Sequence, residues 1–132
     1  MTHIEKELLA KDLSGRLDYE PYIKIEGCAN GCSNVFLTGI YYDYEDYGAK
    51  DYYVNNGYDI SRVKPYLFPL TSMTDKQREE EKHLKEELYS FDANGNVFTL
   101  QDFYNKYHID YRGLIPMGLA IDATDLNIYY IY

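Results

Sequence analysis

The sequence predicts an α+β fold: a small twisted antiparallel sheet or an SH3-like partial barrel, with an N-terminal helix and two further helices. Three segments carry helical periodicity behind a capping residue. The stretch 19–59 consists instead of short β-branched and aromatic segments separated by turn residues. With 132 residues the chain is long enough for one hydrophobic core and too short for two ordinary domains, so residues 1–132 are expected to form a single domain.

The first helix is expected between Thr2 and Gly15. Thr2 and Glu5 have the spacing of a capping box, in which each side chain accepts a hydrogen bond from the backbone of the other residue. Apolar residues then recur at helical spacing: Ile4, Leu8 and Leu9. Gly15 suits the end of the helix, because glycine readily adopts the left-handed conformation that terminates helices.

Residues 19–59 predict three or four antiparallel strands. The segments YEPYIKIEG, NVFLTGIYYDY and KDYYVNNGYDI are rich in Tyr, Ile, Val, Phe and Thr, and the turn-forming strings CANGCS, EDYGA and NNG separate them. A lone hairpin is only marginally stable in water, so strands this short are expected to curl into a small barrel or a twisted meander.

Pro65 and Pro69 shape the next segment. Proline cannot donate a backbone hydrogen bond, so RVKPYLFPL is expected to be neither a helix nor a central strand, but an extended segment over the sheet. A second capping box, Thr74 with Gln77, then starts a charged helix that is expected to be mostly solvated. Its narrow apolar stripe is Met73, Leu84 and Leu88.

The last third of the chain predicts a turn, a third helix and a final strand. DANGN, residues 92–96, reads as a turn between two short strands, and Thr99 as the cap of a helix. The core-facing residues of that helix are Leu100, Phe103, Tyr104 and Tyr107. GLIPMGLA, residues 113–120, is expected to be a buried apolar plug, and the alternation of LNIYYIY, residues 126–132, fits a closing strand.

Charge excludes two classes of partner. Thirteen basic residues against 22 acidic ones give a net charge of −9, and the basic residues form no patch, so neither direct nucleic-acid binding nor attraction to an anionic membrane is expected. No stretch approaches the roughly 20 apolar residues that span a bilayer, and no leader segment is recognised. Two cysteines, Cys28 and Cys32, do not make a disulfide framework, so a cytoplasmic protein with free thiols is expected.

Three strings resemble a known group: LLAKDLSGRL (8–17), KPYLFPLTSMT (64–74) and DYRGLIPMGLAIDATDLNIY (110–129). They are similar to a family of small uncharacterised proteins encoded by gut Bacteroidales and their phages and mobile elements. Members often carry Cys where this chain has Ser14, and a Pro-Tyr-Gly near its Asp18 and Tyr19, so a required thiol at that position is not expected. The resemblance implies a genomic setting and no catalytic residue.

No metal or cofactor is predicted. Cys28 and Cys32 have a spacing compatible with two zinc ligands, but a structural zinc site needs four, and thiols flanking a turn are the preferred interpretation. Asp122, Asp125 and Asn127 place three oxygen ligands close together without the spacing or the glycine of a calcium loop. Turn-forming and capping roles explain these three residues more simply.

His108, Asp110 and Arg112 are the only candidates for catalysis. They would suit acid–base or phosphate chemistry if they converged in a pocket. The preferred interpretation is structural: His108 lies near the last carbonyls of a helix, and Asp110 or a neighbour pairs with Arg112 to hold the following loop.

The stretch YYDYEDYGAKDYY, residues 41–53, is the best candidate for a binding surface. The chain has 17 tyrosines against 5 phenylalanines and no tryptophan, and six of those tyrosines lie here beside four carboxylates. Exposed tyrosine offers large, rigid contact area at low entropic cost. The predicted surface of this hairpin consists of Tyr41, Asp43, Tyr44, Glu45, Asp46, Tyr47, Asp51 and Tyr53. Along the first strand, Tyr42 and Tyr44 are expected on one face, and Tyr41, Asp43 and Glu45 on the other.

These observations favour a non-enzymatic protein-binding accessory protein of a phage or mobile element, whose partner is a host or phage protein. The first alternative is an acidic DNA mimic that inhibits a host defence nuclease. The second is a small enzyme using His108, Asp110 and Arg112. The tyrosine-rich surface is also compatible with a homodimer.

Overall fold

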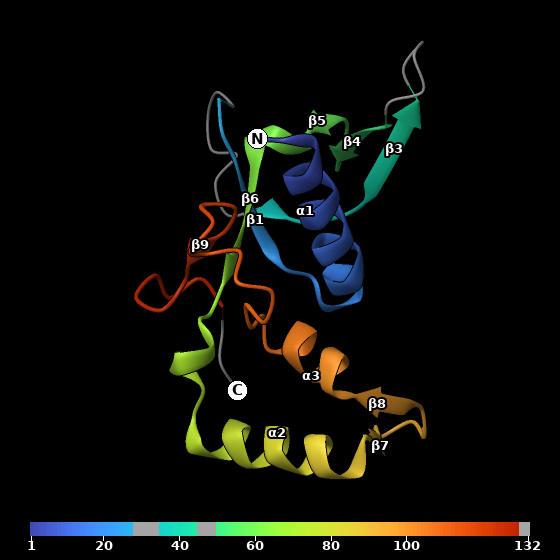
Figure 1. The fold of residues 1–132 in the computed structure, drawn as a ribbon, viewed down its shortest axis with the longest axis vertical. Coiled ribbons are helices and arrows are strands. Elements are labelled where there is room, and N and C mark those ends of the chain that lie inside the picture. The colour runs from blue at the N-terminus through green and yellow to red at the C-terminus, as the bar shows by residue number, and fades with distance from the viewer. Residues whose placement is uncertain (28–34, 45–49, 130–132) are drawn as a thin grey trace.

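The computed structural model describes residues 1–27, 35–44 and 50–129. Its helices and small sheets confirm the predicted α+β class (Figure 1). The α-helices are α1 (His3–Arg16), α2 (Asp75–Glu87) and α3 (Leu100–Lys106). The strands are β1 (Tyr22–Ile25), β2 (Val35–Phe36), β3 (Ile40–Tyr44), β4 (Lys50–Val54), β5 (Tyr58–Asp59), β6 (Val63–Leu67), β7 (Tyr89–Phe91), β8 (Val97–Thr99) and β9 (Ile121–Asp122). Short 3₁₀ turns occupy Leu17–Tyr19, Ile60–Arg62 and Leu70–Ser72.

Helix α1 begins as predicted and ends one residue late. The side chain of Thr2 accepts from the Glu5 amide at 3.1 Å, and Glu5 accepts from the Thr2 amide at 2.8 Å, which confirms the capping box. The helix passes through Gly15, so the predicted stop there is wrong. Arg16 extends it, because its guanidinium is held by Asp12 one turn earlier. Ile4 faces solvent, and the buried face is Leu9, Ala10, Asp12, Leu13 and Arg16.

Strand β6 lies inside the four-stranded sheet, whose order is β2-β1-β6-β9. The prediction that Pro65 excludes a central strand is therefore wrong. The amide of Glu26 donates to the Arg62 carbonyl, and alternation along the antiparallel pair puts Pro65, opposite Ile23, at a position that donates no hydrogen bond to β1. Pairing with β9 on the other side starts only at Tyr66, so the missing N–H of Pro65 faces no ladder.

The second sheet contains the tyrosine-rich hairpin, in the order β3-β4-β5. Both of its strand pairs are antiparallel, as predicted, whereas β9 joins the first sheet in parallel. In Figure 1 helix α1 lies alongside this hairpin, and the far end of β3 stands away from the rest of the chain. Tyr52 on β4 packs against the main hydrophobic cluster, so the hairpin is attached by one face.

The lower half of Figure 1 holds α2, α3 and the β7–β8 hairpin, at the places where the sequence predicts them. Thr74 and Thr99 form capping boxes with Gln77 and Asp102. Met73 and Leu84 are buried as predicted. Leu88 is not part of the buried stripe: it is 76% exposed, and its φ of +67° turns the chain out of α2.

The predicted strand over residues 126–132 is wrong for its described part, since the backbone through Tyr129 is not in a strand; residues 130–132 lie outside the described residues. Tyr129 is fixed by its side chain instead. Its hydroxyl donates to the Tyr66 carbonyl at 2.8 Å and accepts from the Tyr22 amide at 2.8 Å. Tyr129 therefore docks through its side chain across β1 and β6.

Two hydrophobic clusters form the interior. The larger lies between α1 and the two main sheets and includes Leu9, Leu13, Ile23, Val54, Ile60, Val63 and Leu67. The smaller lies between α2 and α3 and consists of Met73, Leu84, Phe103, Tyr104 and Ile109. The predicted plug at 113–120 is only partly buried: Leu114, Leu119 and Ala120 enter the larger cluster, whereas Pro116, Met117 and Gly118 are exposed.

Candidate functional site

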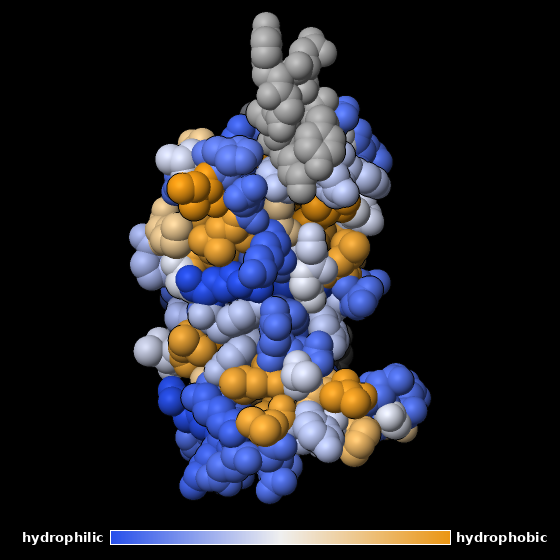
Figure 2. Space-filling view, turned by 45° about the vertical axis from the view of Figure 1, so that its right-hand side comes forward, coloured by the Kyte–Doolittle hydropathy of each residue, from blue (hydrophilic) through white to orange (hydrophobic). Residues whose placement is uncertain are grey.

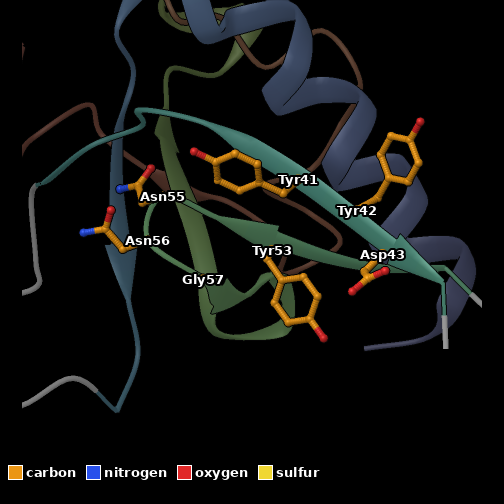
Figure 3. A pocket seen from close by; sticks show the side chains of 7 residues that line it. All are labelled: Tyr41, Tyr42, Asp43, Tyr53, Asn55, Asn56 and Gly57. Carbon is orange, nitrogen blue, oxygen red and sulfur yellow. The ribbon is translucent and has the colours of Figure 1, made fainter.

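The hairpin of β3 and β4 places two tyrosines and two carboxylates on one face. Tyr41 lies opposite Tyr53, and Asp43 lies opposite Asp51. Side chains alternate along a strand, so these four residues share a face and Tyr42 lies on the other. Figure 3 shows Tyr42 pointing away from Asp43 and Tyr53. The shared face carrying Tyr41, Asp43, Asp51 and Tyr53 is called the hairpin face below.

An open depression of about 460 Å³ lies beside this face. It is lined by Tyr41, Tyr42, Asp43, Tyr53, Asn55, Asn56 and Gly57 (Figure 3). Its tyrosines are accessible: 54% of Tyr41 and 60% of Tyr42 are exposed to solvent. A partner can therefore reach both rings of β3 without any rearrangement of the hairpin.

Asn55 fixes the base of the depression. Its side chain accepts from the Thr38 amide at 2.7 Å and donates to the Phe36 carbonyl at 2.9 Å. Its own amide donates to the Gly39 carbonyl at 2.9 Å. Asn55 has a φ of +53°, a conformation that asparagine tolerates better than most residues. These bonds hold the residues before β3 against the turn after β4.

Gly39 leaves the space that the Tyr41 ring occupies. A Cβ atom at position 39 would lie 2.6 Å from the Tyr41 hydroxyl and 2.9 Å from the ring carbon that carries it. The ring therefore lies back over the glycine backbone. Only a residue without a side chain leaves that space, so the orientation of Tyr41 depends on Gly39.

The structure describes part of the binding surface predicted from the sequence. Tyr41, Asp43, Asp51 and Tyr53 are brought together on the hairpin face. Tyr44 belongs to β3, whereas Glu45, Asp46 and Tyr47 lie outside the described residues. Tyr42 lies on the opposite face from Tyr41 and Asp43, as predicted, and is 60% exposed, whereas Tyr52 opposite it packs against the hydrophobic cluster.

The three candidate catalytic residues lie on one loop, but each has a different partner. Asp110 accepts hydrogen bonds from the amides of Leu114 and Ile115, at 2.8 Å each. Arg112 donates to Asp12 at 3.2 Å, and not to Asp110. These contacts hold the 110–115 loop against α1.

His108 stacks on Tyr129, with ring centroids 3.9 Å apart and an interplanar angle of 14°. Burial and, to a smaller extent, the nearby positive charge of Arg16 lower the pKa of its imidazole from 6.5 to about 4. His108 is thus neutral near pH 7. Its φ of +57° makes the turn that ends α3.

A buried polar network at the end of α1 was not predicted. Arg16 donates to Asp12 at 2.8 and 3.1 Å and to the Ile109 carbonyl at 2.7 Å. Asp12 and Arg16 have no exposed surface at all. The i, i+4 spacing of Asp12 and Arg16 on the apolar side of a predicted helix could have predicted this pair. The network joins the two halves of the fold and contacts no cavity described above.

A second exposed surface lies on the β7–β8 hairpin, and the sequence reasoning also missed it. Leu88, Tyr89, Phe91 and Val97 are each more than half exposed. Tyr89 and Phe91 share a face, and Val97 lies opposite Phe91. Figure 2 shows hydrophobic surface bordering the strongly hydrophilic lower end of the molecule, where α2 lies. This group is called the lower patch below.

The described residues offer little for a metal or a membrane. Within residues 1–27, 35–44 and 50–129, no three His, Cys, Asp or Glu side chains gather as metal ligands. Cys28 and Cys32 lie outside that part of the chain. Asp122 accepts from the Thr124 amide at 2.9 Å, the turn-forming role expected of it. None of the helices described is both long and apolar enough to cross a bilayer.

No family model matches this chain, and neither a curated protein nor a solved structure matches it. Functional assignment therefore rests on the surfaces themselves, because a fold class alone does not determine a function. The origin in a phage or mobile element, which the resemblance of residues 8–17, 64–74 and 110–129 implies, stays a prediction.

Proposed function

We propose that the protein is a non-enzymatic binding module that contacts a protein partner through the β3–β4 hairpin. The observation that supports this most is the exposure of Tyr41 and Tyr42 beside an open depression. Large aromatic side chains are costly to leave in water and are enriched where proteins meet. Tyrosine tolerates both states, since its ring packs and its hydroxyl remains solvated.

Preorganisation supports the same assignment. Asn55, in the turn after β4, binds the backbone of Phe36 and Thr38 before β3, and Gly39 leaves space for the Tyr41 ring. A surface that is already ordered loses less conformational entropy when a partner binds. The tyrosines are thus held in a binding-competent arrangement before any contact is made.

The biological setting follows from the resemblance. The protein would be an accessory protein of a phage or mobile element of gut Bacteroidales, located in the cytoplasm, with a host or phage protein as its partner. Its net charge of −9 favours partners with a basic surface over nucleic acids.

A pull-down with matched variants tests the proposal. Affinity-tagged wild-type protein is incubated with host lysate, and bound proteins are cross-linked and identified by mass spectrometry. The test variant is Tyr41→Ser with Tyr42→Ser, and the control is Tyr89→Ser with Phe91→Ser, which removes two aromatics from the lower patch. Melting temperatures of both variants are measured beside the wild type.

The proposal predicts one protein that is captured by the wild type and by the lower-patch control and lost with the Tyr41, Tyr42 variant. Its cross-links should map to residues 41–57. If the partner is instead lost with the Tyr89, Phe91 control variant, binding belongs to the lower patch and the hairpin proposal is overturned. Equal capture by all three proteins would exclude both surfaces.

A DNA mimic is the second candidate, because Asp43 and Asp51 lie opposite one another on the hairpin face. Alternate residues on a strand face lie about 6.6–6.8 Å apart, whereas B-DNA carries one phosphate per about 3.4 Å on each strand. A single hairpin is thus too sparsely charged to imitate a duplex, and α2 dilutes its acids with basic residues. Competition by duplex DNA for the captured partner, weakening as salt rises, would favour this candidate.

An enzyme built on His108, Asp110 and Arg112 is the third candidate. Each of these side chains already holds a structural contact, with Tyr129, with the 114–115 backbone and with Asp12 respectively. His108→Ala would abolish turnover without unfolding if this candidate were right. The geometry supports it less well than binding.

A further inference from the structure

We infer that the junction where the end of α1 meets α3 is an internal water site, in which one water molecule is bound by Arg16, Asn105 and His108 (Figure 1). Three buried atoms carry this inference: Nη1 of Arg16, Oδ1 of Asn105 and Nδ1 of His108. Among the described residues these are the only buried side-chain nitrogen or oxygen atoms without a hydrogen-bond partner in the protein. All three belong to this one junction, which plays no part in the proposed binding function.

Arg16 brings its remaining nitrogen to the end of α3. Its Nε and Nη2 atoms donate to Asp12, and Nη2 also donates to the Ile109 carbonyl at 2.7 Å. Nη1 is the third nitrogen of the same planar group, and the whole side chain is buried. Nη1 therefore lies in the interior, near the turn at His108 that ends α3.

Asn105 approaches the same place from α3. A Cβ atom at Gly15 would lie 3.3 Å from the Asn105 Nδ2 atom, so the side-chain amide packs on α1 one residue before Arg16. Only 3% of Asn105 is exposed. The amide of His108 donates to the Asn105 carbonyl at 3.2 Å, which holds these two residues in one turn.

His108 supplies the third atom. Its ring is fixed by stacking on Tyr129, and the charge of Arg16 affects the pKa of both rings, which places the guanidinium near them. The imidazole is neutral near pH 7, so one of its nitrogens donates and the other accepts. Because a nearby positive charge favours a lone pair over an N–H group, Nδ1 is the acceptor and Nε2 carries the proton.

Water satisfies this set of one donor and two acceptors. Unpaired polar groups are costly to bury, and internal water molecules typically form about three hydrogen bonds to such groups. The water oxygen accepts from Arg16 Nη1, and its two hydrogens donate to Asn105 Oδ1 and His108 Nδ1. One molecule thus provides partners for all three atoms.

Two other arrangements fit less well. Arg16 and Arg112 both donate to Asp12, so one carboxylate faces two guanidinium groups, and this positive charge would attract an anion. A halide has no hydrogen to donate, however, and would leave the acceptors of Asn105 and His108 facing a negative charge. A direct bond from Arg16 to Asn105 would leave His108 Nδ1 unpaired.

A high-resolution crystal structure of the wild-type protein is the first test, with a second crystal soaked in sodium bromide. The inference predicts one solvent peak within about 2.7–3.2 Å of Arg16 Nη1, Asn105 Oδ1 and His108 Nδ1. The soaked crystal should show no anomalous bromide signal at that position. Nitrogen-15 shifts of the His108 ring, measured by NMR, should show the proton on Nε2.

Matched variants test the site in solution. Asn105→Leu removes the acceptor and keeps a side chain of similar size, and Asn94→Leu makes the same change at an exposed position between β7 and β8. Oxygen-17 relaxation dispersion counts the long-lived internal water molecules in each protein, and circular dichroism checks that both variants are folded. The count should fall by one molecule in Asn105→Leu and stay unchanged in Asn94→Leu.

Four outcomes would overturn the inference. Bromide at the predicted position would make the junction an anion site. A direct bond between Arg16 Nη1 and Asn105 Oδ1, without a solvent peak, would show that no water is bound. A proton on His108 Nδ1 would reject the acceptor role of that atom, and an unchanged count in Asn105→Leu would reject Asn105 as a water ligand. If Asn105→Leu does not fold, the wild-type crystals decide.

Discussion

The guanidinium of Arg16 donates to the carboxylate of Asp12 at 2.8 Å, and both side chains are fully buried. Replacing one member of a buried pair leaves an uncompensated charge, so Arg16→Met should lower the free energy of unfolding by about 3–5 kcal/mol. Urea denaturation followed by circular dichroism measures this loss.

An ion pair with an exposed lysine provides the control. Lys85 lies 3.6 Å from Glu81 on the surface of α2, and Lys85→Met should change the free energy of unfolding by no more than about 1 kcal/mol. The double variant Asp12→Leu, Arg16→Met should be less destabilised than the sum of its single changes. A loss below that of the surface pair would refute the structural role of Arg16.

Acid should destabilise the protein through His108. The pKa of its imidazole is about 4 in the folded state against 6.5 ordinarily, so the unfolded chain binds the proton more readily between those values. The resulting stabilisation is fully present above pH 6.5 and is lost as the pH falls through about 4, on the order of 3 kcal/mol in all. Unfolding free energies measured across this range in His108→Gln should fall less steeply than in the wild type.

A direct titration checks the cause of that acid sensitivity. The His108 ring signals, followed by NMR, should shift with a midpoint near pH 4. The carboxyl pKa values of Asp59 and Asp92 are lowered by hydrogen bonds, against an opposing effect of burial, so their contributions are lost only at more acid pH. A midpoint for His108 near its ordinary value would show that the ring is not buried as described.

Tyr129→Phe should cost about 1–3 kcal/mol of unfolding free energy, because the Tyr22 amide and the Tyr66 carbonyl would lose their partner. Tyr111→Phe is the matched control. The Tyr111 hydroxyl accepts from the Gln101 side chain at 3.0 Å in an exposed position, and its loss should matter by less than about 0.5 kcal/mol. Equal losses would contradict the docking of Tyr129 across β1 and β6.

Gly39→Ala should weaken partner capture without unfolding the protein. The added Cβ would lie 2.6 Å from the Tyr41 hydroxyl, and the half-exposed ring can swing away at little energetic cost. Partner affinity should fall about as far as with Tyr41→Ala, while the melting temperature stays near that of the wild type. Unchanged affinity would show that the seated orientation of Tyr41 does not matter for binding.

Leu88→Gly should stabilise the protein by about 1 kcal/mol, because a φ of +67° is unfavourable for leucine and free for glycine. Little burial is lost, since 76% of Leu88 is exposed. Chemical denaturation beside Leu126→Gly, an exposed leucine without positive φ, gives the comparison. A destabilised Leu88→Gly variant would indicate that the leucine makes apolar contacts that outweigh the strain.

The helices could be predicted because their starts are determined locally. Thr2, Thr74 and Thr99 each cap the helix that follows, through residues three positions away. The wrong predictions concern residues whose positions depend on contacts with distant parts of the chain. Pro65 fits a central strand because the pairing of β6 with β9 begins one residue later, at Tyr66. Tyr129 docks on residues 107 and 63 positions away.

In the candidate site, too, local features could be predicted and features set by distant contacts could not. The hairpin of residues 41–53 follows from alternation and a turn, and its placement on β3 and β4 was predictable. The exposure of Tyr42 was not, since Tyr42 shares its face with Tyr52 and the buried Val54, and alternation alone does not show how much of that face is covered.

The bond from Arg16 to the Ile109 carbonyl joins residues 93 positions apart, which has a consequence for synthesis on the ribosome. The arginine leaves the ribosome before its acceptor, which is made 93 residues later. Until residue 109 emerges, the cation cannot be buried with all its partners, and α1 must remain solvated at that end. The N-terminal half should therefore wait as a loosely packed intermediate, and completion of this contact should make folding nearly simultaneous in both halves.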